Sequence, residues 1–208
     1  MVVPHVRGGG EKGDAWHKAG FKITKPNTWK DMIACTQYEI DHNYTSPQKT
    51  VLWGTSAGGI MAGRAMTDRP DLYAAVIMLS PALNMLRCEI QPNGLNSIKE
   101  FGTVQKEAQF KALLEMDSYH QLQKNTTYPA VLIKTGIKDG RVAAWDPAKF
   151  IAKLQAYTTS DKPILFDIDF DEGHGGANTS VMEEYIFYAD VFAVAYWQTG
   201  HPDYQPGE

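Results

Sequence analysis

The stretch LWGTSAGGI (Leu52–Ile60) runs from an apolar segment directly into a serine that is held between glycines. Residues 54–58 fit the pattern G-x-S-x-G. They lie between a pattern typical of a buried strand and a pattern typical of a helix, which is the context in which G-x-S-x-G marks a nucleophilic serine. The sequence therefore predicts a sharp strand-to-helix turn with Ser56 at its tip. The alternative is a glycine-rich turn whose serine only caps the helix.

The chemistry of such a turn explains the spacing of its glycines. The nucleophile has a strained backbone, and we expect glycine two residues before and two residues after it because side chains there would collide with neighbouring backbone. The turn also places the serine near a helix N-terminus, where backbone N–H groups face a developing negative charge.

The composition of the whole chain is that of a globular protein. It has 208 residues, of which 43% are apolar and 11% aromatic, and its net charge is −4. These values predict one domain over residues 1–208. The absence of a basic run, of a long apolar span and of a signal-peptide pattern at the amino terminus predicts small molecules or peptides as partners, with no nucleic acid and no membrane. The two cysteines, Cys35 and Cys88, fit reduced thiols and a cytoplasmic location.

Strand patterns and helix patterns alternate along the chain. Near-continuous apolar runs predict strands over residues 49–53, 73–81, 128–136 and 162–170. Helical spacing predicts helices over residues 28–44, 57–67, 146–157 and 179–197, with Thr28 and Asp146 as caps. This alternation is typical of the α/β class, with a mostly parallel sheet that is covered by helices on both faces.

A serine nucleophile needs a histidine base and a carboxylate that orients the base. Asp139 follows the strand predicted over 128–136, and His174 follows the strand predicted over 162–170. The order Ser, Asp, His and the position of each residue at the carboxyl end of a strand identify Ser56, Asp139 and His174 as the candidate triad. Asp171 and Glu172 also lie beside His174, but residues this close in sequence seldom orient the imidazole from behind.

Several motifs in order along the chain resemble the catalytic domain of the prolyl oligopeptidase family of serine peptidases. They are RGGGEKGDAWHKAG (7–20), GTSAGG (54–59), EFG (100–102), TGIKDGRV (135–142) and GHGG (173–176). The resemblance implies an α/β-hydrolase fold and a triad of Ser56, Asp139 and His174. It also implies an oxyanion donor in the N–H of Ala57 and a substrate-carbonyl ligand in Arg141. Phe101 and Val142 are candidates for an apolar substrate pocket, and a core role is equally compatible with either residue.

The chain also departs from the family pattern. The β-propeller, the first strands of the hydrolase sheet and the upstream tyrosine that supplies a second oxyanion donor have no counterpart in this sequence. Ser97 stands where prolyl-cleaving members carry a tryptophan that stacks on the substrate proline. An incomplete sheet edge has unpaired backbone groups, so we expect a homo-oligomer that completes the edge.

The sequence therefore predicts a serine hydrolase that cleaves peptide or small carboxylic ester bonds through an acyl-enzyme on Ser56. Three alternatives remain open: a carboxylesterase without peptidase activity, a catalytically vestigial assembly or binding domain, and a non-hydrolytic α/β binding protein. No spacing of metal ligands and no phosphate-binding loop is present, so we expect neither a metal nor an organic cofactor.

Overall fold

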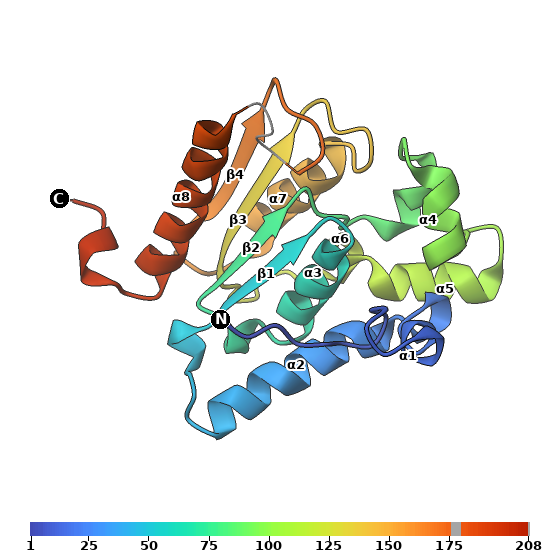
Figure 1. Cartoon of the computed structure of the whole chain (residues 1–208), viewed down its shortest axis with the longest axis horizontal. Coiled ribbons are helices and arrows are strands. Elements are labelled where there is room, and N and C mark those ends of the chain that lie inside the picture. Colours follow the sequence, from blue (N-terminus) through green and yellow to red (C-terminus); the bar gives the residue numbers. More distant parts are fainter. Residues whose placement is uncertain (176–179, 208) are drawn as a thin grey trace.

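The computed structural model describes residues 1–175 and 180–207, and the centre of the described part is a sheet of four parallel strands. The strands lie in the sheet in the same order as in the sequence (Figure 1). They are β1 (Val51–Thr55), β2 (Ala75–Leu79), β3 (Ala130–Gly136) and β4 (Ile164–Asp169). Each strand overlaps a predicted one, and the predicted α/β class with a parallel sheet is confirmed.

Because the strands are parallel, each connection crosses the sheet and all four carboxyl ends meet at one edge. The crossing between β1 and β2 contains α3 (Gly58–Asp68), and the crossing between β3 and β4 contains α7 (Trp145–Tyr157). The longer crossing from β2 to β3 contains η4 (Met85–Ile90), α4 (Gly94–Phe101), α5 (Glu107–Met116) and α6 (Ser118–Gln121). The remaining described helices are α1 (Asp14–Lys18), α2 (Pro26–Asp41), α8 (Val181–Gln198) and the short 3₁₀ turns η1 (Lys22–Thr24), η2 (Pro47–Lys49), η3 (Pro70–Leu72) and η5 (Pro202–Tyr204).

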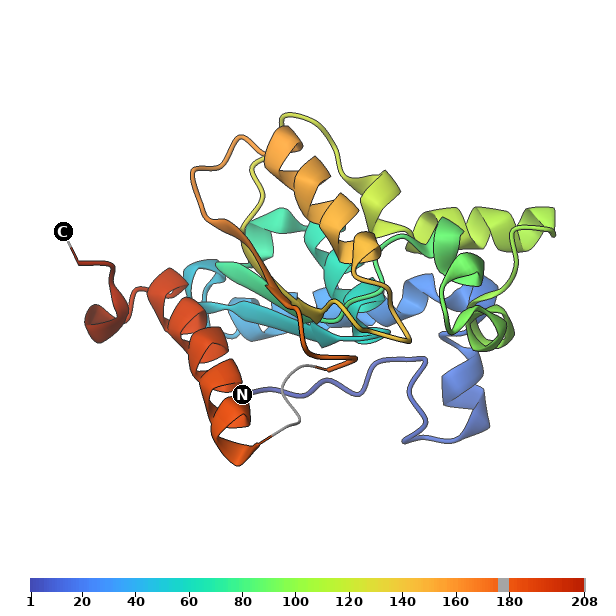
Figure 2. The ribbon, with the colours of Figure 1, turned by 90° about the horizontal axis from the view of Figure 1, so that it is seen from above.

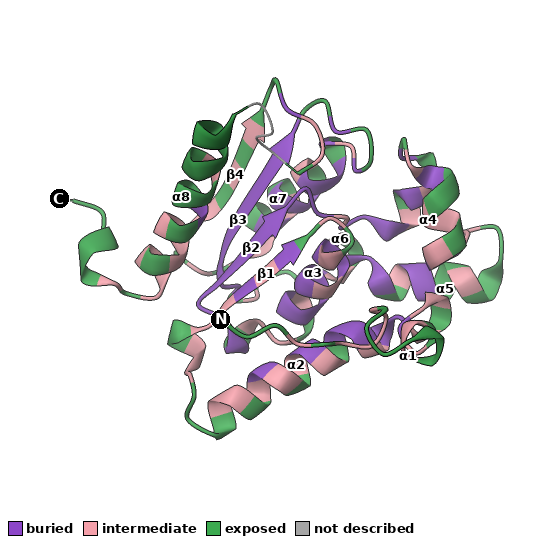
Figure 3. Cartoon of the chain, viewed as in Figure 1, coloured by how far each residue is buried: buried purple, intermediate pink, exposed green. Residues whose placement is uncertain are grey.

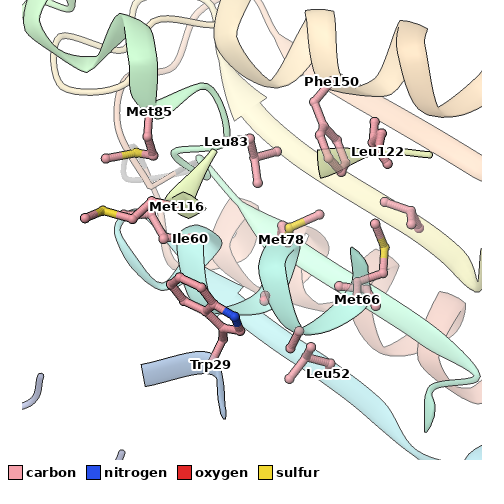
Figure 4. Packing of buried hydrophobic residues seen from close by; sticks show 14 of the residues in the cluster. Trp29, Leu52, Ile60, Met66, Met78, Leu83, Met85, Met116, Leu122 and Phe150 are labelled. Atoms are coloured by element: carbon pink, nitrogen blue, oxygen red, sulfur yellow. The ribbon is translucent and has the colours of Figure 1, made fainter. Parts of the chain in front are cut away.

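Helices cover both faces of the sheet, and the side chains of β2 alternate between two cores. Val76 and Met78 point into the larger core, which is formed with α2, α3 and α7 (Figure 4). Ile77 and Leu79 point to the opposite face, where they pack with Val191 of α8. Figure 2 shows α7 and α8 on opposite sides of the sheet. All residues of β2 are buried, as expected for a central parallel strand (Figure 3).

The amino-terminal segment 7–20 makes side-chain contacts with both α2 and α4. The Arg7 guanidinium binds the carboxylate of Asp31 in α2, with Nε 2.8 Å from Oδ2. The indole N–H of Trp16 donates to the carbonyl of Val6 at 3.0 Å. His17 Nε2 lies 3.1 Å from both carboxylate oxygens of Glu100 in α4. The segment thus fixes the chain before α2 against both α2 and α4.

Two predicted helix caps are wrong. α2 begins at Pro26, so Thr28 lies within the helix, where its hydroxyl donates to the carbonyl of Arg7 at 2.7 Å. α7 begins at Trp145, so Asp146 lies in the first turn instead of at the cap. The predicted start of the last helix, Thr179, lies outside the described residues, and α8 follows Ser180, whose hydroxyl accepts the N–H of Glu183 at 3.2 Å.

Within residues 1–175 and 180–207, no helix has both the length and the apolar character that a bilayer span needs.

Candidate active site

Ser56 lies at the carboxyl end of β1, in the turn that leads into α3. Its φ angle is +55°, in the left-handed region that a non-glycine residue seldom adopts. Neighbouring backbone holds it there, because Ser56 N–H donates to the carbonyl of Leu79 at 2.8 Å and the carbonyl of Ser56 accepts the N–H of Ala82 at 3.1 Å. The predicted sharp turn is present, and its strain is held by the end of β2.

The glycines around Ser56 differ from the expected pattern in one respect. A Cβ at Gly54 would lie 2.6 Å from the carbonyl oxygen of Gly58 and 2.7 Å from Ala62 Cβ, so glycine is needed at this position. A Cβ at Gly58 would meet no atom within 4 Å, whereas a Cβ at Gly59 would overlap Pro81. The position after the serine that requires glycine is therefore Gly59, and the expectation for Gly58 is wrong.

Ser56, His174 and Asp139 form one continuous chain of hydrogen bonds. His174 Nε2 lies 2.9 Å from Ser56 Oγ, and His174 Nδ1 lies 2.7 Å from Asp139 Oδ2. The Asp139 side chain is fully buried, whereas 16% of the His174 side chain is exposed. The three residues come from loops after β1, β3 and β4, which end at the same edge of the sheet.

The second oxygen of Asp139 has partners of its own. Oδ1 accepts the backbone N–H groups of Arg141 at 2.8 Å and Val142 at 2.9 Å. These bonds fix the carboxylate so that Oδ2 faces the imidazole. The neighbouring acids have different contacts, because Asp171 pairs with Lys138 at 3.1 Å and the backbone N–H of Glu172 donates to Asp169 at 3.1 Å.

Ser80 supports the histidine loop and was missed by the sequence reasoning. Its hydroxyl accepts the N–H of Gly175, the residue after His174, at 3.2 Å. Its φ angle of +44° is also in the left-handed region. The only available signal was its position directly after a buried strand and before Pro81, which does not distinguish it from an ordinary strand end.

The N–H of Ala57 has no hydrogen-bond acceptor in the described part of the chain, and it lies at the N-cap of α3 next to Ser56. A free donor at a helix N-terminus beside a nucleophile can stabilise an oxyanion.

The predicted substrate-binding residues have different surroundings. The Arg141 side chain is exposed and has no ion pair or hydrogen bond with the described residues, while its backbone N–H binds Asp139. Val142 is buried beside Asp139. Phe101 belongs to the larger core, and Lys25 Nζ lies 5.6 Å from the centre of its ring. Ser97 lies in α4, where its hydroxyl donates to the carbonyl of Asn93 at 3.3 Å.

Among the described residues, no group of three or more His, Cys, Asp or Glu side chains is arranged to hold a metal ion.

Comparison with known proteins places this chain in a family. A sequence profile of the prolyl oligopeptidase family matches residues 1–198. The prolyl endopeptidase of Dictyostelium discoideum is 33% identical over 203 residues, which cover 93% of this chain and 27% of the relative. The prolyl endopeptidase of Elizabethkingia meningoseptica is 35% identical over 200 residues, which cover 96% of this chain and 28% of the relative.

Solved structures of prolyl oligopeptidase relatives are also similar to this chain. A structure from a study of two prolyl endopeptidases and their inter-domain dynamics superposes with a TM-score of 0.90 at 35% identity, over 96% of this chain and 29% of that one. Oligopeptidase B from Leishmania major superposes with a TM-score of 0.84 at 28% identity, over 96% of this chain and 27% of that one. The chain thus spans just over a quarter of the length of these relatives, and the part that it spans is an α/β-hydrolase domain. From the match over 1–198 and these relatives, we conclude that the chain belongs to the prolyl oligopeptidase family.

Proposed function

We propose that this protein is a serine hydrolase of the prolyl oligopeptidase type, which cleaves peptide or small carboxylic ester bonds through an acyl-enzyme on Ser56. The observation that carries the proposal is the chain of hydrogen bonds from Ser56 through His174 to Asp139, with distances of 2.9 and 2.7 Å. The geometry matches the requirements of nucleophilic catalysis by serine, in which a base touches the nucleophile and a carboxylate orients the base.

In the acylation step, Ser56 Oγ attacks the carbonyl carbon of the substrate while His174 Nε2 takes the hydroxyl proton. Asp139 stabilises the imidazolium that forms, since its Oδ2 accepts from Nδ1 at 2.7 Å. The tetrahedral intermediate then expels the amine or alcohol, which leaves with the proton from Nε2. In the deacylation step, His174 takes a proton from water, the hydroxide attacks the ester on Ser56, and the acid departs as Oγ regains its proton.

The negative charge that develops on the carbonyl oxygen needs hydrogen-bond donors. The free N–H of Ala57 is the donor that we assign to this role, supported by its position directly after Ser56 and at the N-terminus of α3. Loss of one such donor typically costs about a hundred- to a thousandfold in rate, so this single N–H is a substantial part of the catalytic apparatus.

Peptides are the proposed substrate class. The names of the relatives, prolyl endopeptidase and oligopeptidase B, support this choice. Arg141 is exposed next to the triad acid, and its guanidinium is available to bind a peptide carbonyl. Ser97 in α4 cannot stack on a proline ring, which supports a site that also accepts small esters.

Two substrates test the proposal: a blocked Gly-Pro anilide and a short-chain nitrophenyl ester, with the Ser56→Ala variant as the blank. We expect turnover of at least one substrate, which the blank lacks. Anilide cleavage identifies a peptidase, and ester cleavage alone identifies a carboxylesterase. A folded wild-type protein that cleaves neither substrate contradicts the proposal and favours a vestigial assembly domain.

We further propose that two copies associate through the free long side of β1, the outermost strand of the described sheet. Successive residues of a strand direct their N–H and C=O groups to opposite sides, and Ser56 N–H donates to Leu79 at the end of β2. The backbone groups of Val51, Trp53 and Thr55 therefore point away from β2, toward the open side of the sheet. The ring of Trp53 lies 6.2 Å from that of Tyr188 and 6.0 Å from that of Phe192, so an apolar surface continues from this edge onto α8. Light scattering should give the mass of a dimer or larger assembly, and Phe192→Glu should reduce it. A monomer at micromolar concentration contradicts this proposal.

The cytoplasm is the compartment that we propose for this activity. Both cysteines are free thiols, Cys35 half-buried and Cys88 buried, which supports a reducing environment. Cell fractionation followed by immunodetection tests this assignment, and recovery outside the cytoplasm contradicts it.

A further inference from the structure

A buried carboxylate outside the triad connects the segments that carry Ser56 and Asp139. Asp146, in the first turn of α7, is 1% exposed. Its Oδ1 accepts the backbone N–H groups of Leu83 at 3.1 Å and Asn84 at 2.9 Å. Its Oδ2 accepts from Gln91 Nε2 at 2.8 Å. Asp146 therefore binds the segment after β2 and the residue that follows η4.

Gln91 extends this connection to the loop of the triad acid. Gln91 Oε1 accepts the N–H of Ala143 at 2.7 Å. The two preceding N–H groups, of Arg141 and Val142, both donate to Asp139. Three consecutive backbone donors are thus fixed by two side chains, so the position of the Asp139 loop depends on Gln91.

The same carboxylate reaches the serine turn from the other side. Leu83, which donates to Asp146, directly follows Ala82, whose N–H donates to the carbonyl of Ser56 at 3.1 Å. The path from Ser56 to Asp139 through Ala82, Asp146 and Gln91 therefore consists of hydrogen bonds and short pieces of chain.

The direction of these hydrogen bonds requires a carboxylate in the middle. The chain of hydrogen bonds through Gln91 and Asp146 has a backbone donor at each end. The N–H of Ala143 donates at the Gln91 end, and the N–H groups of Leu83 and Asn84 donate at the Asp146 end. The glutamine amide accepts on one side and donates on the other, so its partner must accept on both sides. An amide at position 146 would face Gln91 with N–H against N–H, or leave a buried backbone donor without a partner.

The charged and titratable groups around Asp146 come from three elements. Burial raises the pKa of Asp146 to about 7, against the effect of the two N–H bonds from Leu83 and Asn84. Asp117 at the start of α6 raises this pKa further, and Lys149 of α7 lowers it. The Cys88 thiol of η4 also faces this region, and burial raises its pKa to about 12. Above neutral pH, Asp146 is therefore ionised and acts as the double acceptor.

We propose that Asp146 and Gln91 are a positioning pair that holds the Asp139 loop in register with the Ser56 turn. This inference rests on the proposed function and adds to it two residues that act through the triad without touching its side chains. Their role is to keep two distances short enough for proton transfer: the distance from Asp139 to His174 and the distance from His174 to Ser56.

The test compares variants at about pH 8, where Asp146 is ionised. Asp146→Asn should lower kcat about ten- to a hundredfold with little change in KM, because the loop that carries Asp139 loses its anchor. The double variant Gln91→Glu/Asp146→Asn moves the carboxylate to position 91 and restores every donor-acceptor pair. It should recover most of the wild-type kcat.

Asp117→Asn is the matched control. Asp117 is also fully buried, and it accepts from the backbone N–H groups of Leu86 and His120, each at 2.9 Å, and from Asn84 Nδ2 at 2.8 Å. It has no bond to Gln91 or to the Asp139 loop, and at pH 8 its removal leaves Asp146 ionised, because the Asp117 charge raises the pKa of Asp146. This variant should lower the melting temperature and leave kcat of the folded protein unchanged. If Asp146→Asn does not fold, Gln91→Leu serves in its place. It removes the bonds of Gln91 to Ala143 and to Asp146 but keeps the bonds of Asp146 to Leu83 and Asn84, and it should show the same loss of kcat.

Two outcomes would overturn the positioning role: a folded Asp146→Asn protein with wild-type kcat, or a double variant that is stable but as impaired as the single one. A second readout separates this result from a failure of the proposed function. The far-downfield NMR resonance of the proton between His174 and Asp139 should be present in the wild type and the double variant and lost in Asp146→Asn. It needs no substrate, so it decides the positioning role even if the wild type turns over neither substrate.

Discussion

His174 Nε2 lies 2.9 Å from Ser56 Oγ, although the two residues are 118 positions apart in the sequence. The parallel sheet brings them together, because β1 and β4 both end at the edge where the loops gather. Asp139 joins them from the loop after β3, and its buried side chain accepts from His174 at 2.7 Å. The proposed chemistry therefore depends on three loops whose relative positions are fixed by one sheet.

Asp139→Asn tests the orienting role of the carboxylate. The amide oxygen would take the place of Oδ1 at the N–H groups of Arg141 and Val142, which leaves the NH₂ group facing His174 Nδ1. The imidazole would then carry its proton on Nε2, where it cannot accept the proton of Ser56. We expect kcat to fall by about 10⁴ while the melting temperature changes little. Asp171→Asn, which alters an exposed acid in the next loop, is the control and should retain wild-type kcat.

Two adjacent glycines give a prediction about the fold of the turn. Gly59→Ala should destabilise the protein by about 1–3 kcal/mol, because its Cβ would overlap Pro81. Gly58→Ala should leave stability unchanged or raise it by up to about 1 kcal/mol, since its Cβ meets open space at the start of α3. Urea unfolding of both variants measures the difference. Equal destabilisation by the two substitutions would refute this account of the turn.

Arg141→Ala tests the assignment of a substrate ligand. A hydrogen bond from a charged group is worth about 1.5–3 kcal/mol, so kcat/KM for the Gly-Pro anilide should fall about ten- to a hundredfold. The small nitrophenyl ester lacks the second carbonyl, and its cleavage should change much less. Lys138→Ala removes the same charge from the same loop and should affect neither substrate. An equal loss on both substrates in Arg141→Ala would remove the assignment.

The raised pKa of Asp146 predicts a pH-dependent contribution to stability. Burial raises this pKa from 3.8 to about 7, so the folded protein binds the proton more tightly than the unfolded chain. The resulting stabilisation is complete below about pH 4 and is lost as the pH rises to about 7. The unfolding free energy of the wild type minus that of Asp146→Asn should therefore fall by about 1.4 kcal/mol per pH unit across that range and then level off. Urea unfolding at several pH values measures this difference, and a flat or rising difference would disprove the assignment.

The sequence predicted the strands and the turn because those features are local. Apolar runs bounded by turn residues indicated all four described strands, and Ser56 between glycines indicated the strained turn. Asp139 and His174 could be chosen because parallel strands end at a common edge. In each case a short-range pattern and a simple rule of sheet topology were enough.

The features that the sequence could not predict depend on long-range contacts. Asp146 before Pro147 has the pattern of a helix cap, yet its carboxylate is buried against Leu83, Asn84 and Gln91. The need for glycine at position 59 arises from Pro81, which belongs to the loop after the next strand. The helices α4, α5 and α6 are short, so their stability comes from packing that no local pattern reveals.

Labelling with a fluorophosphonate, followed by intact-mass and peptide mass spectrometry, tests the central claim most directly. Our account predicts one adduct, on Ser56, which forms rapidly in the wild type, slowly in His174→Ala and not at all in Ser56→Ala, while Ser97→Ala labels as the wild type does. A folded wild-type protein that takes up no label, or a Ser56→Ala protein that labels at the wild-type rate, would contradict the claim that Ser56 is the nucleophile.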